Sequence, residues 1–210
     1  MRQRIASAHG DAQTTDIAAS ERDRRELLRD GFALGSAALA ASSIPLWLSA
    51  RDAFAAQDSG DAEILQNAIN LEQVAVTAYD MALSGGLLSP AALRVARRFR
   101  DHEQQHADAL TTALTDLGGT PPAPPKGSAD VEKIADGLGD AKTQADVVNV
   151  LIELEMAGVA AYHDAQAKLV ETRLLQTAAS IMASEGQHLV VLRRLVGANP
   201  VPKAFETGAI

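Results

Sequence analysis

A Glu-x-x-His tetrapeptide that occurs twice places the tightest limit on how this chain folds. The first copy is Glu103-Gln-Gln-His106 and the second is Glu185-Gly-Gln-His188. Residues three apart on a helix lie on one face, so the Glu and His of each copy can reach a single metal ion. One such match can arise by chance. Two matches inside a longer repeat are much harder to explain in that way.

A related segment precedes each tetrapeptide by about thirty residues. NLEQVAVTAY ends at Tyr79 and ELEMAGVAAY ends at Tyr162, and the two share Leu, Glu, Val, Ala and Tyr at matching positions. Glu72 and Glu155 are 83 positions apart, and the two tetrapeptides are 82 apart. The chain therefore contains one helix-pair unit twice.

Local signals predict two helices in each half. In the first half, Asp58 to Asp61 supply cap residues for a helix that ends near Leu83, and Ser89-Pro90 begins the next helix. The expected inward stripe of that second helix is Ala96, Phe99, Glu103, His106, Leu110, Ala113 and Leu117.

In the second half, a third helix starts near Thr143 or Asp146. We place the following turn at 170–172, and the fourth helix ends before Gly197. Beyond it, the tail is expected to form an extended strap.

The connection between the halves, from Gly118 to about Thr143, is rich in Gly and Pro and cannot be one helix. A short helical piece is expected from about Ala129 to Leu138. A connection this long suits a crossover that runs the length of a bundle. The sequence therefore predicts an all-α four-helix bundle of two repeated helical hairpins joined by a long crossover.

The charged residues fall at one level of this bundle. Measured from the first hairpin turn, Glu72 lies about 17 Å and Glu103 about 20 Å along their helices at about 1.5 Å per residue. The second hairpin gives similar figures, so four carboxylates and two imidazoles converge at mid-height. Carboxylates in a bundle core repel one another and are costly to bury, and a pair of divalent cations removes that cost.

One Glu from each of two helices and a Glu-x-x-His from each of the other two is the arrangement of the di-iron and di-manganese carboxylate proteins. In these motifs the chain resembles the ferritin-like superfamily, over about Asp61 to Val196. It looks closest to the bacterial group that carries export signals, with rubrerythrin and manganese catalase as more distant relatives. The resemblance implies that Glu72 and Glu155 are terminal carboxylates. It implies that Glu103 and Glu185 bridge the two ions, and that His106 and His188 each bind one ion.

Several other residues lie close to the expected ligands in the sequence. Tyr79 and Tyr162 each lie seven residues past a ligand Glu and face inward. They are either ordinary core tyrosines or groups that support the site, through a hydrogen bond to a carboxylate or as electron donors. Glu153 is expected to be solvated, and His102 and His163 are expected at the surface or rim.

The resemblance implies a centre of two Fe ions, or alternatively two Mn ions, with O2 or hydrogen peroxide as the small-molecule oxidant. Oxidation of Fe(II) or reduction of O2 or peroxide is the leading expectation. Manganese-catalase-like dismutation of peroxide and a non-catalytic binding or structural bundle remain alternatives, and whether the protein is an enzyme stays open. A homo-oligomer is possible.

The composition excludes several classes of partner and metal site. A net charge of −8 and the lack of a basic stripe argue against a nucleic-acid partner. The chain has no cysteine, which excludes disulfides, thiolate metal sites and the four-cysteine electron-transfer module of rubrerythrin.

Residues 1–56 read as an export signal with a polar leader, and 57–210 as the bundle domain with its tail. Arg24-Arg25 precedes a moderately apolar run from about Gly31 to Leu48, and Ala53-Phe-Ala55 fits a cleavage pattern. This resembles a twin-arginine signal, which implies the twin-arginine export machinery as a partner. It also implies a location in the periplasm, in the cell envelope or outside the cell. An uncleaved N-terminal membrane anchor is the alternative.

Overall fold

The computed structural model describes residues 60–208. Within this range all regular secondary structure is helical: α3 (Asp61–Ser84), α4 (Pro90–Asp116), α5 (Ser128–Val131), α6 (Gln144–Gln166) and α7 (Thr172–Leu195). The export segment predicted at residues 1–56 lies outside the described residues. Among residues 60–208, no helix combines the length and apolar character that crossing a bilayer requires.

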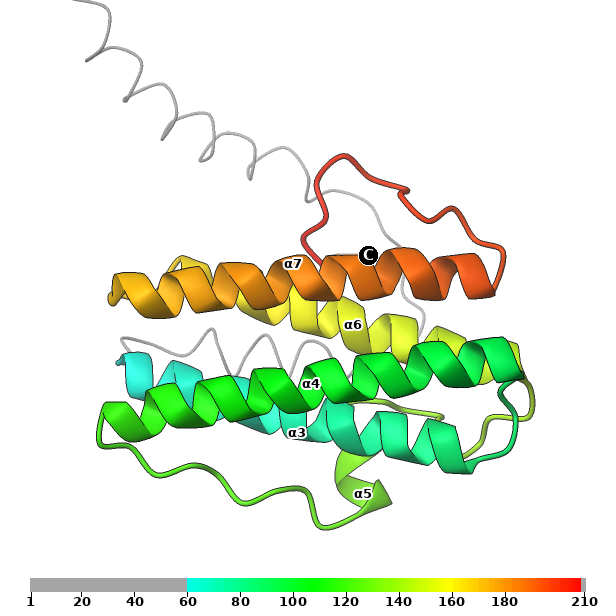
Figure 1. The fold of residues 1–210 in the computed structure, drawn as a ribbon, viewed down its shortest axis with the longest axis horizontal. Helices are drawn as coiled ribbons and strands as arrows, with labels where there is room; N and C mark the ends of the chain where they lie inside the picture. The colour runs from blue at the N-terminus through cyan, green and yellow to red at the C-terminus, as the bar shows by residue number, and fades with distance from the viewer. Residues whose placement is uncertain (1–59, 209–210) are drawn as a thin grey trace, which may run out of the picture. The chain divides into compact units, whose positions relative to one another are not determined.

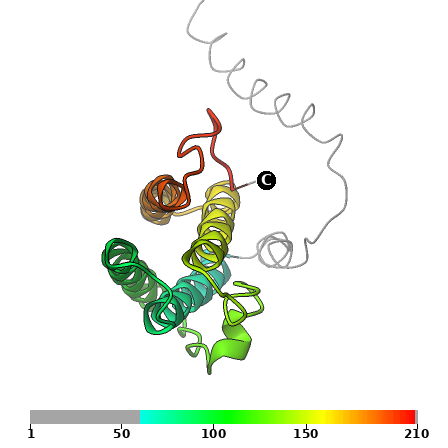
Figure 2. The same ribbon diagram turned by 90° about the vertical axis from the view of Figure 1, so that its right-hand side faces the viewer.

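The four long helices form two antiparallel hairpins that pack into one bundle (Figure 1). Helix α3 packs along α4, and α6 packs along α7. Between the hairpins, α3 contacts α6 and α4 contacts α7, so the end-on view shows one helix at each corner (Figure 2). The predicted all-α bundle of two hairpins with a long crossover is confirmed.

Two of the predicted helix starts are fixed by side-chain caps. The Ser89 hydroxyl accepts a hydrogen bond from the backbone N–H of Ala92, and Pro90 occupies the first helical position of α4. Thr143 and Asp146 form a reciprocal capping box at the start of α6. These bonds set where the two helices begin, and therefore the height of their glutamates.

The turn of the second hairpin differs from the prediction. Helix α6 ends at Gln166, so the connection begins earlier than the predicted turn at 170–172. The Asp61 carboxylate accepts hydrogen bonds from the backbone N–H groups of Val170 and Glu171, both at 2.9 Å. A contact from the start of α3 therefore holds this connection out of the helical conformation.

The inward stripe of α4 also departs from the prediction at its end. Leu117 was expected inside the bundle but is 44% exposed, whereas Leu114 is fully buried. The spacing from Leu110 to Leu117 assumed a repeat of seven residues. A straight helix drifts away from such a repeat, and this drift brings Leu114 to the core.

The crossover contains less helix than expected. Helix α5 covers only the first part of the predicted Ala129 to Leu138 segment, and turns follow it. The Glu132 carboxylate accepts hydrogen bonds from the N–H groups of Gly137 and Gly139, which curls the chain back. Three apolar side chains of this segment are nevertheless buried in the core: Val131, Ala135 and Leu138.

The apolar core consists of two clusters, each of which contains one of the two tyrosines. The first includes Tyr79, Phe99, Leu151 and Leu192. The second includes Ile69, Leu110, Leu114, Tyr162 and Ile181. The buried acidic residues belong to neither cluster, so a polar layer interrupts the core.

The tail after α7 is non-helical, as expected, and packs back onto the second hairpin. Arg193 of α7 forms an ion pair of 2.9 Å with Glu206. Gly208 has a φ of +69°, and a Cβ atom there would lie 2.2 Å from the carbonyl oxygen of Met156. Only glycine fits this contact between the tail and α6.

Candidate metal centre

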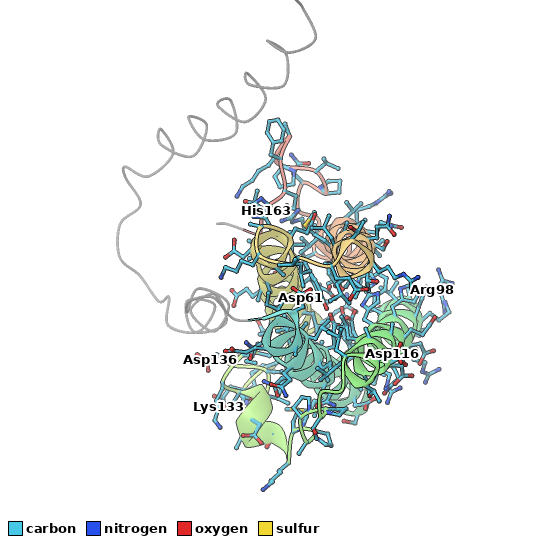
Figure 3. All side chains as sticks on the ribbon, turned by 90° about the vertical axis from the view of Figure 1, so that its left-hand side faces the viewer. Asp61, Arg98, Asp116, Lys133, Asp136 and His163 are labelled. Carbon is cyan, nitrogen blue, oxygen red and sulfur yellow. The ribbon has the colours of Figure 1, made fainter. Side chains whose placement is uncertain are left out.

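The structure brings together all six residues that the sequence predicts as metal ligands. One comes from α3, two from α4, one from α6 and two from α7: Glu72, Glu103, His106, Glu155, Glu185 and His188. The four carboxylates and His188 are buried, and His106 is partly buried. Viewed along the bundle, side-chain oxygen atoms lie in the interior between the helices (Figure 3). Four helices therefore contribute to one buried polar layer.

The six residues form two overlapping groups, each able to hold a metal ion. Glu72 and His106 belong only to the first, and Glu155 and His188 only to the second. Glu103 and Glu185 belong to both. In each group, one ligand atom from every residue lies within 4.8 Å of the others.

The first group surrounds the Nδ1 atom of His106. Glu185 Oε1 lies 3.1 Å from this nitrogen, Glu103 Oε2 lies 3.4 Å away, and Glu72 Oε2 lies 3.6 Å away.

The second group surrounds the Nδ1 atom of His188. Glu103 Oε1 lies 3.0 Å from it, Glu155 Oε2 lies 3.1 Å away, and Glu185 Oε2 lies 3.3 Å away. Glu103 and Glu185 thus direct one oxygen toward each histidine.

Comparison with known protein families agrees with this geometry. Residues 60–198 match the family described as ferritin-like domain. The chain belongs to the ferritin-like domain family. No curated protein matches it.

Among solved structures, the chain is similar to a conserved hypothetical protein from Mycobacterium tuberculosis. The TM-score is 0.57 at 18% sequence identity, and the match covers 76% of this chain and 99% of the other. This likeness supports the ferritin-like fold alone.

The residues of this ferritin-like centre fit a bound metal. Among the six residues of the centre, three buried atoms have no hydrogen-bond partner of acceptable geometry: Glu103 Oε1, His106 Nδ1 and Glu185 Oε1. Buried polar atoms without partners are costly. A cation in the His106 group would satisfy His106 Nδ1 and Glu185 Oε1, and a cation in the His188 group would satisfy Glu103 Oε1. Carboxylate oxygens and one imidazole per position are ligands that Fe and Mn accept.

Each tyrosine of the ferritin-like repeat hydrogen-bonds to a glutamate of the other hairpin. The Tyr79 hydroxyl of α3 donates to Glu155 Oε1 of α6, and the Tyr162 hydroxyl of α6 donates to Glu72 Oε1 of α3. These bonds match one of the roles predicted for the tyrosines. They occupy one oxygen of each terminal carboxylate and leave Oε2 directed toward the histidine.

Burial controls the protonation of Glu72 and Glu155. It raises the pKa of Glu72 well above its usual range, and the charges of Glu103 and Glu185 add to the shift. Burial and repulsion by Glu185 raise the pKa of Glu155 to about 8. In the metal-free protein, these two carboxyl groups therefore tend to hold a proton.

The two histidines are held in their charged forms. Burial acts against their charged forms, but the three carboxylates around each ring favour the charged form and raise the pKa of both His106 and His188 to about 12. Burial also acts to raise the pKa of Glu185, but hydrogen bonds from Glu155 and the two histidines lower it overall. Without metal, protons thus balance part of the buried negative charge.

A small cavity of about 10 Å³ lies between α3 and α6, on the side of the carboxylates. Leu71, Ala75, Leu154 and Gly158 line it together with the four glutamates, and neither histidine is part of the lining. This volume is enough for about one small molecule the size of water.

Sequence reasoning missed one contact at this centre. His102 lies at the rim, as expected, but its Nδ1 is 2.9 Å from the Nε2 of His188. The contact joins α4 to α7, and periodicity within α4 could not reveal it. Glu153 is exposed as predicted, and His163 is partly buried on α6, away from the centre (Figure 3).

Proposed function

We propose that this ferritin-like protein holds two metal ions, Fe or alternatively Mn, and uses them to oxidise Fe(II) or to reduce O2 or peroxide. The observation that carries the proposal is the division of oxygens at Glu103 and Glu185. Each of these carboxylates presents one oxygen to the group of His106 and the other to the group of His188. Two ions bridged by two carboxylates require this division.

The remaining ligands complete the two positions. Glu72 and His106 would hold one ion, and Glu155 and His188 the other, each histidine through its Nδ1. Binding requires neutral imidazoles and ionised carboxylates, so the protons held in the metal-free state must leave.

The chain also supplies the surroundings that such chemistry needs. When bound, two Fe(II) ions would supply the two electrons that, with two protons, reduce one H2O2 to two H2O. The two apolar clusters limit access of bulk water, and the cavity beside the glutamates has room for one molecule about the size of water. Because the chain has no cysteine, electrons must come from Fe(II) as substrate or from an external donor.

Metal content per chain, measured by elemental analysis after purification without chelators, tests the proposal first. We expect about two Fe or Mn per chain. Fe would lead to assays of Fe(II) oxidation and peroxide reduction, and Mn to assays of donor-free peroxide dismutation.

Glu103→Ala and His188→Ala should both lower the metal content and the peroxide reactivity together. Full metal content and activity in both variants would refute the ligand assignment. No metal, and no uptake of Fe(II) or Mn(II) on reconstitution, would instead support a structural or binding bundle.

A further inference from the structure

The two histidines of the repeat have different surroundings. The His188 side chain is only 1% exposed, and its ring stacks on Phe99 with the ring centroids 3.9 Å apart. Its Nε2 lies 2.9 Å from His102 Nδ1 and 3.5 Å from Ser184 Oγ. The His106 side chain is 14% exposed, and the structure shows no hydrogen bond from its Nε2 to any part of residues 60–208.

This difference arises at one pair of equivalent positions in the repeat. The residue before the motif glutamate is His102 in the first half and Ser184 in the second. His102 reaches across from α4 to the histidine of α7. A matching contact from Ser184 to His106 does not form, because the Ser184 hydroxyl lies beside His188 on its own helix.

The contact with His102 suits the tautomer of His188 that binds a metal ion through Nδ1. A neutral imidazole has one N–H donor and one acceptor nitrogen. If Nε2 of His188 donates to His102 Nδ1, the proton lies on Nε2 and the lone pair of Nδ1 faces the carboxylates.

We propose that His102 is a positioning residue that makes the two metal positions unequal, so that the His188 position fills first and the His106 position fills second. This inference rests on the metal centre proposed above. A ligand already held in its binding orientation and tautomer loses less freedom when the ion binds. Hydrogen-bond partners of metal-ligating histidines are typically worth about 10- to 100-fold in metal affinity.

Stepwise titration of the metal-stripped protein with Co(II) alone, followed by its d–d absorption, measures both affinities. We expect two steps, with the first about 10-fold or more tighter than the second. His102→Leu should weaken the first step by about 10-fold and leave the second nearly unchanged. His102→Asn, whose amide oxygen can take the place of Nδ1, should restore the tight step and its spectrum. Ser184→Ala is the matched control and should keep the tight first step, because the Ser184 hydroxyl lies as far as 3.5 Å from His188 Nε2.

Crystals of the unaltered protein with one equivalent of Mn(II) provide a test that needs no variant. Anomalous density should lie mainly at the group of Glu155 and His188. Filling of the His106 position first, or two Co(II) steps that His102→Leu leaves unchanged, would overturn this inference while the two-metal centre stands. Failure of the unaltered protein to bind any of Co(II), Mn(II) and Fe(II) would overturn the proposed function itself.

Discussion

Filling the cavity beside the glutamates should raise stability and lower reactivity at once. Gly158 lies in the interior of α6 and lines the cavity. A Cβ atom added there would meet Glu185 Cγ at 3.5 Å and Cδ at 3.8 Å, which are ordinary van der Waals distances. Gly158→Ala should therefore fold without displacing the ligand.

The expected sizes follow from this geometry. Alanine is favoured over glycine in a helix interior by about 1 kcal/mol, so the metal-stripped variant should melt roughly 3 °C higher. The cavity of about 10 Å³ holds one small molecule, and a methyl group takes most of that space. Each 1.4 kcal/mol added to the cost of admitting the oxidant slows its reaction about 10-fold.

Gly186→Ala is the matched control. Gly186 lies in the interior of α7, and nothing lies within 4 Å of a Cβ atom added there. Both variants should gain similar stability and keep their metal content, but only Gly158→Ala should slow peroxide consumption in stopped-flow measurements. Equal peroxide rates in Gly158→Ala, Gly186→Ala and the unaltered protein would show that the oxidant does not use this cavity.

Three other predictions address the carboxylates and the leader. Tyr79→Phe should weaken binding of the ion beside His188 by about 10-fold, and Tyr162→Phe should weaken binding of the ion beside His106, as measured from the two steps of a Co(II) titration. Equal effects of either variant on both steps would contradict the pairing of each tyrosine with one metal position. Because the pKa of Glu155 in the folded metal-free protein is about 8, above its usual 4.5, the stability that its proton contributes is complete below pH 4.5 and is lost as the pH rises through about 8. Thermal melts from about pH 6 to 9 should therefore show that the metal-stripped protein loses stability as the pH rises, while its metal affinity increases. Stability and metal affinity that change in the same direction with pH would refute this account. Replacing Arg24 and Arg25 by Lys should stop export of a reporter fused to residues 1–56, and unchanged export would exclude the twin-arginine route.

The sequence was sufficient to predict the fold and the height of the site, because both depend on regular spacing along helices. Glu103 and His106 share a face whatever surrounds them, and the two copies of the motif imply two hairpins. The errors occurred where distant parts of the chain meet. The Asp61 carboxylate binds the backbone N–H groups of Val170 and Glu171 within the connection between α6 and α7, and Asp61 and Val170 are 109 positions apart.

The missed contact of His102 has the same origin. It lies on the flank of its own helix stripe, and only the packing of α4 against α7 brings it to His188. The predicted burial of Leu117 was wrong for a local reason instead, because the helix drifts from the assumed seven-residue repeat near its end.

The hydrogen bonds between each tyrosine and a glutamate of the other hairpin indicate how a chain of two similar hairpins can arise. Each group of ligands takes three residues from one hairpin and one from the other, and each terminal glutamate is held by a tyrosine of the opposite hairpin. A single hairpin therefore completes neither position. Two identical hairpins related by a two-fold axis would complete both. Gene duplication and fusion would preserve such a pairing within one polypeptide, and the two halves could then diverge, as they have at His102 and Ser184.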